Sequence, residues 1–498
     1  MFSVVVHVLA SSFTPALRLP PVSSAPHLRA PAVHACAVNA EKLAALESWL
    51  SANGVDGLKA TGGELPGYGQ CLVAGTDGIK AGETVLEIPA SLHITPSSVA
   101  ESELGKAASS VVPPDDAEAL LALGLLAEFG KGEAGASWAY INMLPDAEAM
   151  GSVPLLWTDD DRARLLGGSH LVDTVGAMRE GLLAQWAALE ANVLPNHPDS
   201  LFPREVFNAA GWLWANAVVL TRALPFGDEQ ALIPFLDLAN HQSNAATACS
   251  IGVVGAEGVS MVVDAQQLEG GKEAVAVLTA AEDFAPGEQV FIDYGEAGWR
   301  SSWEMLYTYG FVPGEGIADW VRTGGRPLYF DGVSADDPLI EQKRAILVAL
   351  GADEGAWEGT WLDLKADPDQ CIAMAPLLRF AQLVPGGDYA DADLKDLVEQ
   401  IEGWGASPQE VWARMSRPLD TPTEAKVAAR VRAQCEAALE ALPAAETLAE
   451  AAKEDGAAED PREMLAARVL LGERSALEAC IAVWSAGGVD VADGASAK

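Results

Sequence analysis

Residues 233–241 read IPFLDLANH, an apolar stretch that closes on three polar side chains, Asp237, Asn240 and His241. A lone histidine at the end of an apolar segment is more often a hydrogen-bonded structural residue than a ligand-binding one. Asn240 and His241 together are more informative, because their side chains and backbone groups can clamp the edge of a purine-like ring. The stretch is therefore a candidate ligand site, with a structural histidine as the alternative.

A second informative stretch, PGEQVFIDYG at residues 286–295, is followed by YGFV at residues 309–312. A tyrosine between a β-type run and a glycine is normally a packing residue. Here two tyrosines, Tyr294 and Tyr309, are each followed by glycine. The pair favours a pocket with aromatic walls and hydroxyl tips.

Two weaker features accompany these stretches. The sequence PGYG at residues 66–69 is by default a turn, although its glycines could bring backbone groups close to a ligand. It is not a dinucleotide-binding fingerprint, because no third glycine and no helix follow at the right spacing. Arg222 ends a helical segment that is apolar nearly all round from residue 207 to residue 220. A charge there needs a partner, which is either a ligand carboxylate or a structural salt bridge.

The order of the predicted elements indicates an α+β protein. Short β-type runs come first, a long helical region follows, short β-type runs return, and helical patterns dominate from about residue 337. This order predicts a β-rich domain split by a helical insertion and followed by a separate helical domain. The Gly-containing segments between the first two runs favour a hairpin. The expected strands are 70–74, 84–88, 250–254, 259–263, 273–279 and 289–293, and the expected helices include 115–129 and most of 137–225.

Composition excludes several classes of protein. The 498 residues carry 31 basic and 71 acidic side chains, a net charge of −40, so the chain is a poor general binder of nucleic acid. No unbroken apolar run reaches the roughly 18–20 residues of a membrane span. The six cysteines form no C-x-x-C pair, which argues against a thiolate zinc site and against a disulfide framework.

The N-terminal segment has a composition of its own. Residues 1–40 contain no Asp or Glu, and they carry Arg18, Arg29, several serines and many prolines and alanines. This pattern is similar to an organelle transit peptide, and Cys36 lies at a small-residue processing site of the chloroplast kind. We therefore expect residues 1–36 to be a plastid transit peptide that directs the chain to the stroma. A disordered N-terminus and a secretory signal are the alternatives.

Taken in order, these motifs resemble those of the SET-domain protein methyltransferases, and most closely the Rubisco large-subunit lysine methyltransferases. The glycines of residues 66–69, the stretch 233–241 and the stretches 286–295 and 309–312 carry the resemblance. It implies a SET domain of short sheets over residues 42–330, with a helical insert at about 100–225. It also implies a helical substrate-binding-like domain over residues 337–490.

The resemblance implies S-adenosylmethionine as the cofactor and no metal. The residues implied to bind it come from three motifs and the Arg222 helix: Gly67, Tyr68 and Gly69 by their backbone, Arg222 near the carboxylate, Asn240 and His241 around the adenine, and Tyr294 near the sulfonium.

Tyr294 is also the implied catalytic residue, with its hydroxyl near the incoming amine. Asp237, Tyr309 and Phe311 are implied to line the substrate channel. The implied reaction is methylation of a lysine in a protein, with the Rubisco large subunit or aldolase as family-level partners. The enzyme is expected to be a monomer that acts on neither nucleic acid nor membranes.

Two alternatives stay open. A related subgroup methylates histidine, so the acceptor could be a histidine side chain. The segment between Tyr294 and Tyr309 is two or three residues longer than is usual for the family, which motivates a non-catalytic SET-fold binding or scaffold protein.

Overall fold

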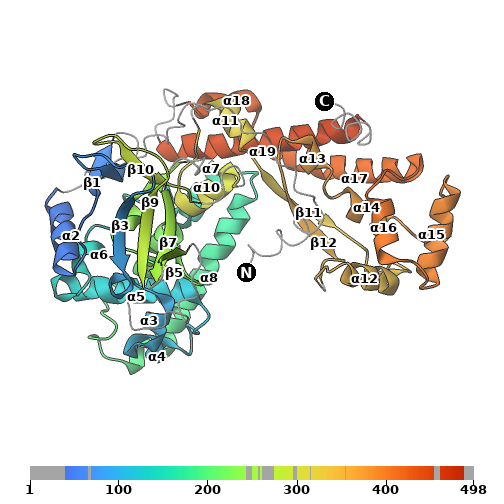
Figure 1. Cartoon of the computed structure of the whole chain (residues 1–498). Helices are drawn as coiled ribbons and strands as arrows, with labels where there is room; N and C mark the ends of the chain where they lie inside the picture. Colours follow the sequence, from blue (N-terminus) through green and yellow to red (C-terminus); the bar gives the residue numbers. More distant parts are fainter. Residues whose placement is uncertain are drawn as a thin grey trace.

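A computed structural model shows the chain as a larger β-containing part and a smaller helical part, joined by one long helix (Figure 1). The long helix, α19 (Pro461–Ser485), extends across both parts. The structure describes residues 40–65, 69–242, 249–255, 258–260, 274–294, 300–314, 316–353, 355–453 and 460–486. The expected transit peptide and the residues Gly67 and Tyr68 lie outside these ranges.

The first sheet brings strands from both ends of the SET-like region together. Its order is β1-β2-β10-β6, and its outer pair β10–β6 is parallel whereas β1–β2 and β2–β10 are antiparallel. Strands that are more than 160 residues apart in sequence are therefore neighbours, which is how distant motifs can share a site. The strands are β1 (Ala60–Leu65), β2 (Gly69–Ala74), β6 (Asn240–His241) and β10 (Gln289–Ile292).

The second sheet shows that the hairpin expected between residues 70–74 and 84–88 is wrong. Its order is β3-β9-β7-β8, so β3 and β2 belong to different sheets. The glycine-rich turns do form, but Ile79 between them bridges to Phe284, which directs β3 (Thr84–Pro89) onto β9 (Val275–Ala280). The long-range pairing therefore overrides the local hairpin signal. The remaining strands are β7 (Cys249–Gly255) and β8 (Gly258–Ser260).

The helical region between the two groups of strands forms as predicted, with small shifts at helix ends. The helix expected at 115–129 is α5 (Ala117–Lys131). Its N-cap is Asp116, whose side chain accepts the backbone N–H of Ala119. The other elements here are α3 (Pro96–Glu101), α4 (Glu103–Ala108), α6 (Trp138–Ile141), α7 (Asp159–Leu165), α8 (Leu171–Asn192), α9 (Ala209–Arg222), β4 (Leu224–Phe226) and β5 (Glu229–Ala231). One further helix, α2 (Ala40–Ala52), precedes β1.

The C-terminal half is helical as expected, apart from one pair of antiparallel strands that the sequence analysis did not predict. β11 (Arg326–Asp331) pairs with β12 (Gly359–Leu364) across a helix, α12 (Ile340–Ala349). Each strand is only six residues long, and no tight turn joins the two strands. The local sequence pattern therefore does not indicate that they pair. The remaining helices of this half are α13 (Pro368–Cys371), α14 (Ala375–Ala381), α15 (Ala392–Glu402), α16 (Pro408–Met415), α17 (Thr421–Glu440) and α18 (Ala445–Ala451). Two helices, α10 (Ser302–Tyr309) and α11 (Ile317–Arg322), precede β11 and lead into it.

Buried apolar side chains form three cores. The first core fills the space between the two sheets and helices α5 and α9, and the third lies in the distal helical part around Phe380. The second core combines Trp157 and Leu171 with Leu306 of α10 and Trp484 of α19. Part of the helical insert therefore packs against the C-terminal half. The domain boundaries at 42–330 and 337–490 stay predictions.

Three cysteines that are far apart in sequence meet in the second core. Cys371, Cys435 and Cys480 are free and fully buried, and Cys71 is free and buried in the first sheet. The neighbouring thiols of Cys371 and Cys435, together with burial, raise the pKa of Cys480. The Cys480 thiol therefore stays protonated at neutral pH, and the three fully buried cysteines pack as small apolar groups.

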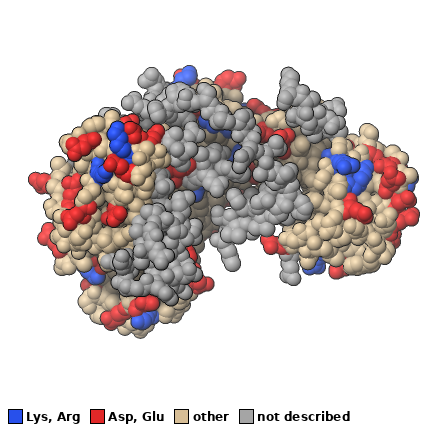
Figure 2. Space-filling view, viewed as in Figure 1, with Lys and Arg blue, Asp and Glu red and all other residues tan. Residues whose placement is uncertain are grey.

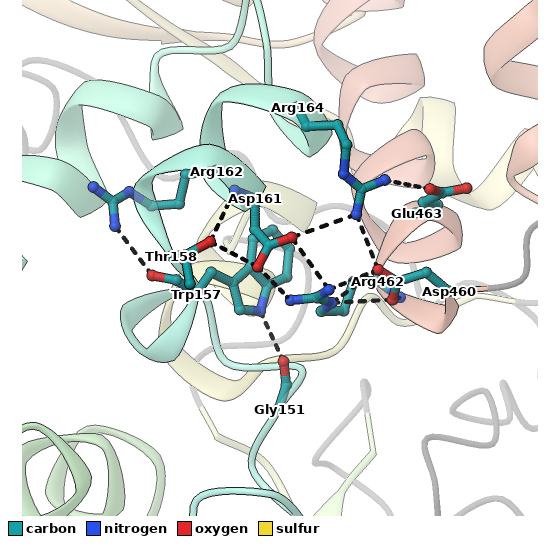
Figure 3. Close-up of polar contacts among 9 residues, drawn as sticks. All are labelled: Gly151, Trp157, Thr158, Asp161, Arg162, Arg164, Asp460, Arg462 and Glu463. Carbon is teal, nitrogen blue, oxygen red and sulfur yellow. Dashed lines mark hydrogen bonds and ion pairs between the residues drawn. The ribbon is translucent and has the colours of Figure 1, made fainter. Parts of the chain in front are cut away.

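An ion-pair network also joins the helical insert to the C-terminal half (Figure 3). Asp161 of α7 accepts from Arg462 at 3.1 Å, and Arg164 reaches Asp460 at 3.1 Å and also Glu463. The network lies at the surface, where each pair is screened by solvent and contributes little by itself. Elsewhere on the visible surface, acidic side chains are scattered over both parts and basic ones are fewer (Figure 2).

Among the residues that the structure describes, none of the helices has the length and hydrophobicity needed to span a lipid bilayer.

Candidate active site

The stretch 233–241 and the stretch 286–295 meet at the β6–β10 junction. Asn240 is paired with Phe291 and His241 with Ile292, and the backbone N–H of Gln242 donates to the carbonyl of Ile292 at 3.1 Å. Just before β6 the chain makes a sharp turn in which buried Phe235 has a φ of 68°. A bulky residue in this region of backbone space is strained, and such strain is retained where surrounding packing determines the turn.

Tyr294 lies directly against the end of the 233–241 stretch. Its hydroxyl donates to the carbonyl of Ala239 at 2.9 Å, and its backbone N–H donates to Nδ1 of His241 at 3.2 Å. Burial raises the pKa of the Tyr294 hydroxyl far above its usual value, so the group stays protonated and acts as a hydrogen-bond donor. These contacts place Tyr294 against the end of the Asn240–His241 stretch, and its catalytic role stays a prediction.

Three aromatic side chains surround Tyr294. The ring centroids of Tyr294 and Tyr309 are 4.6 Å apart, and Phe311 lies 6.4 Å from Tyr294 and 6.0 Å from His241. Tyr309 also donates its hydroxyl to the backbone carbonyl of Tyr294 at 3.1 Å. We call Tyr294, Tyr309, Phe311 and His241 the aromatic cluster.

Asn240 connects this cluster to β2, in the same sheet as β6. Its side-chain amide donates to the backbone carbonyl of Gln70 at 2.9 Å. Gly69, next to Gln70, has a φ of +64°, and a Cβ built there would meet no atom within 4 Å among the described residues. The backbone at Gly69 is therefore open to a ligand, whereas the two residues before it, Gly67 and Tyr68, lie outside the described ranges.

His241 is a neutral histidine. Burial, with the nearby positive charge of Arg300, lowers its pKa from 6.5 to about 4. Its Nδ1 accepts the backbone N–H of Tyr294, so this nitrogen carries no proton. The approach of Asp293 Oδ1 to the same nitrogen at 3.6 Å is therefore not an ion pair.

His241 is expected to make folding sensitive to acid. The folded protein binds this proton less readily than the unfolded chain does, so the stabilisation is complete above pH 6.5 and is lost as the pH falls towards about 4. The loss is at most about 3 kcal/mol. A His241→Gln chain should therefore lose less free energy of unfolding over this pH range than the wild type, measured by urea unfolding. Equal losses in both chains would contradict the prediction.

Arg222 and Asp237 form a buried ion pair. Arg222 lies 3.3 Å from Asp237 Oδ2 and donates to the Asp237 backbone carbonyl at 3.1 Å. Tyr140 donates its hydroxyl to the same carboxylate at 3.0 Å. The salt-bridge alternative for Arg222 therefore describes the contacts seen here. Tyr140 was not among the predicted site residues, and only its place in the motif Ser137-Trp138-x-Tyr140 could have pointed to it.

The C-terminal half matches a known domain family. Residues 334–477 match the family model described as Rubisco LSMT substrate-binding. A crystal structure of the SET domain of LSMT bound to lysine and AdoHcy superposes with a TM-score of 0.72, at 22% identity, over 90% of this chain and 92% of that chain. The chain has a SET-domain fold of the LSMT type.

Curated relatives agree with this SET-type fold. A Nicotiana tabacum Rubisco large subunit N-methyltransferase is 27% identical over 67% of this chain and 61% of its own length. An Arabidopsis thaliana fructose-bisphosphate aldolase-lysine N-methyltransferase is 29% identical over 48% of this chain and 45% of its own length. A Homo sapiens actin-histidine N-methyltransferase is 28% identical over 61% of this chain and 47% of its own length. This SET-fold chain thus spans about half to three fifths of the length of the relatives it matches.

Proposed function

We propose that this chain is an S-adenosylmethionine-dependent methyltransferase that methylates a lysine side chain of a protein. The observation that carries the proposal is the aromatic cluster at the β6–β10 junction, built on a SET-type fold. One of the similar proteins is an aldolase-lysine N-methyltransferase and another is a Rubisco large subunit N-methyltransferase, and the similar solved structure holds lysine and AdoHcy.

The residues around the cluster fit S-adenosylmethionine. The Oε1 atom of Gln70 is buried and accepts no hydrogen bond from the described residues, so an acceptor is available beside Asn240 for an amino group. The open backbone at Gly69 and the neutral ring of His241 lie on the same short sheet. We propose that these residues hold the cofactor, with Gly67 and Tyr68 before them. When bound, the cofactor supplies an electrophilic methyl group.

Arg222 pairs with Asp237, and we propose that it also binds the carboxylate of the cofactor. Its guanidinium has five N–H donors, and Asp237 accepts from only one of its nitrogens, Nη1. Donors therefore remain for the cofactor carboxylate that we propose for Arg222. The side chain of Arg222 is 18% exposed, against 2% for Asp237, so Arg222 is the more accessible partner of the pair.

The chain's own residues prepare the acceptor amine for transfer. A lysine amine has a reference pKa near ~10.4 and must lose its proton before it attacks. A desolvated aromatic site disfavours the ammonium form, and Tyr309 and Phe311 supply such surroundings. The Tyr294 hydroxyl stays protonated, so it positions groups by donating a hydrogen bond and does not act as the base. Holding the reacting groups in line then supplies much of the rate.

The finer statements about partner and place are also proposals. The family match of residues 334–477 supports a protein substrate bound by the C-terminal half. The Rubisco large subunit and aldolase are the candidate substrates, because similar proteins are named for them. Those relatives are described as chloroplastic, which supports a plastid location, and we propose the stroma and a monomeric enzyme.

The proposal is tested by binding and transfer measured on the same sample. S-adenosylmethionine should bind in calorimetry, and a labelled methyl group should appear in a protein when the chain is incubated with plastid extract. An Asn240→Ala chain should bind the cofactor more weakly, because Asn240 ties the 233–241 stretch to β2. Cofactor binding without any methylated protein would overturn the enzymatic proposal. No cofactor binding at all would favour the scaffold alternative.

A histidine acceptor is the second candidate function. The observation that favours it is the similarity to an actin-histidine N-methyltransferase at 28% identity, about the same as to the lysine enzymes. Mass spectrometry of the methylated residue separates the two candidates. A methylated histidine, with no methylated lysine, would replace the leading proposal.

A further inference from the structure

Helix α10 links the aromatic cluster to the C-terminal half of the chain. Its last residue is Tyr309, which donates its hydroxyl to the backbone carbonyl of Tyr294. Its first residue, Ser302, donates its backbone N–H to the carbonyl of Thr323 at 2.8 Å. One short helix therefore has the proposed site at one end and the connection to the substrate-binding family domain at the other.

A single carboxylate of that domain holds the first turn of α10. Asp363, in β12, accepts the hydroxyl of Ser301 on one oxygen and the indole N–H of Trp303 on the other, the latter at 3.1 Å. The contact depends on a close backbone approach, because a Cβ at Gly325 would lie 2.3 Å from the Ser301 hydroxyl and 2.6 Å from Asp363. A Cβ there would have to displace the side chains of Ser301 and Asp363.

The helix is held as a rigid unit between its two ends. Ser301 and Glu304 form a capping box, in which the backbone N–H of Ser301 donates to the Glu304 carboxylate at 2.7 Å. Leu306, in the middle, is fully buried in the second core. At eight residues the helix is only about 12 Å long. A shift or tilt of the first turn of α10 therefore moves Tyr309, at the other end of the helix, by a similar amount.

We propose that Asp363 is a positioning residue for methyl transfer, which acts through α10 to keep the Tyr309 hydroxyl on the Tyr294 carbonyl. Docking of the C-terminal half would then do more than bind the protein substrate, because it would also set the geometry of the aromatic cluster. This inference rests on the proposed function for its kinetic consequence, but its structural part can be tested without any activity.

The structural part is tested by 19F NMR of the full chain with 3-fluorotyrosine at position 309. An Asp363→Ala change should shift or broaden this resonance, although Asp363 is not in contact with Tyr309. The matched control is Arg462→Ala, which removes an ion pair between the same two parts of the chain without touching α10. The control should leave the resonance in place. An unchanged resonance in Asp363→Ala, or an equal shift in both variants, would overturn the proposal.

The kinetic part is tested by a double-mutant cycle with Tyr309→Phe. Asp363→Ala should lower kcat about tenfold to a hundredfold, as expected for a small misplacement of a site residue. The KM for the protein substrate should change far less. The combined variant Asp363→Ala with Tyr309→Phe should be no slower than Tyr309→Phe alone, within about twofold. Fully additive losses would show that Asp363 acts only on overall stability and would overturn the proposal.

Two further results keep the outcomes separate. If Asp363→Ala does not fold, Asp363→Asn retains the shape and one acceptor oxygen, and it should show the same 19F shift and the same non-additivity in smaller degree. If the wild-type chain transfers no methyl group, the proposed function fails, while the 19F comparison still decides whether Asp363 positions Tyr309.

Discussion

A Tyr294→Phe chain is expected to lose about a hundredfold or more of kcat while it keeps its fold and its affinity for S-adenosylmethionine. The hydroxyl donates to the carbonyl of Ala239, and it is the only part of Tyr294 that the substitution removes. Without it, a buried carbonyl loses its donor, and the ring is free to tilt against Tyr309 and His241. The side chain that is misplaced is Tyr294 itself, which we propose to lie beside the reacting atoms.

The role proposed for Tyr294 also predicts how the activity of the Tyr294→Phe variant depends on pH. Burial keeps the pKa of Tyr294 far above its usual value, so the hydroxyl is protonated throughout the pH range of an assay. The residual activity of Tyr294→Phe should therefore follow the same pH profile as the wild type, lowered by a constant factor. A profile that changes shape would show that Tyr294 acts as a base, contrary to the proposed role.

The matched control for Tyr294 is Tyr329→Phe. Tyr329 lies on β11, where its ring is 5.4 Å from that of Trp361, and it is not part of the aromatic cluster. The same chemical change there should leave kcat unaltered. Steady-state methyl transfer and calorimetry with S-adenosylmethionine measure both variants. A Tyr294→Phe chain with wild-type turnover would contradict the role proposed for its hydroxyl.

The second large effect, on the free energy of unfolding, is expected for a change at Glu473. This residue is the buried carboxylate where α19 meets β11 and the helical insert. Its side chain is fully buried, ion-paired with Arg326, and accepts the hydroxyl of Ser169. Replacing Glu473 by alanine leaves Arg326 buried without its counter-charge. Removing one partner of a buried pair costs about 3–5 kcal/mol of the free energy of unfolding. We therefore expect Glu473→Ala to unfold at much lower urea concentration.

Two variants show that this loss comes from the orphaned charge. Glu473→Gln keeps the shape and an acceptor for Ser169 and should lose less stability than the alanine variant. Arg164→Ala breaks the surface network in Figure 3 between the same parts of the chain and should have a much smaller effect, because solvent screens exposed pairs. Urea unfolding followed by tryptophan fluorescence measures all three. An Arg164→Ala loss as large as that of Glu473→Ala would contradict the interpretation.

Local pattern was sufficient for most of the secondary structure. The buried helix ending at Arg222 and the β-type runs around residues 275–280 and 289–292 have the predicted type, because their apolar periodicity and flanking glycines act over a few residues. Errors appear where a long-range partner competes with a local signal. The hairpin expected after β2 is absent because Ile79 pairs with Phe284, about 200 positions away.

The sequence by itself determined which residues are candidates for the chemistry. The order of its motifs indicated a SET-type domain. Glycine neighbours singled out Tyr294 and Tyr309, and the polar end of an apolar stretch singled out His241. Only the tertiary structure decided what these residues contact. It paired Arg222 with Asp237, made His241 an acceptor for the Tyr294 backbone, and placed Asp363 at the start of α10. The physical reason is that hydrogen bonds, burial and charge pairing depend on distances in space. These distances are set by the parallel β6–β10 pair and by the packing of α19, which bring together residues that are far apart in the sequence.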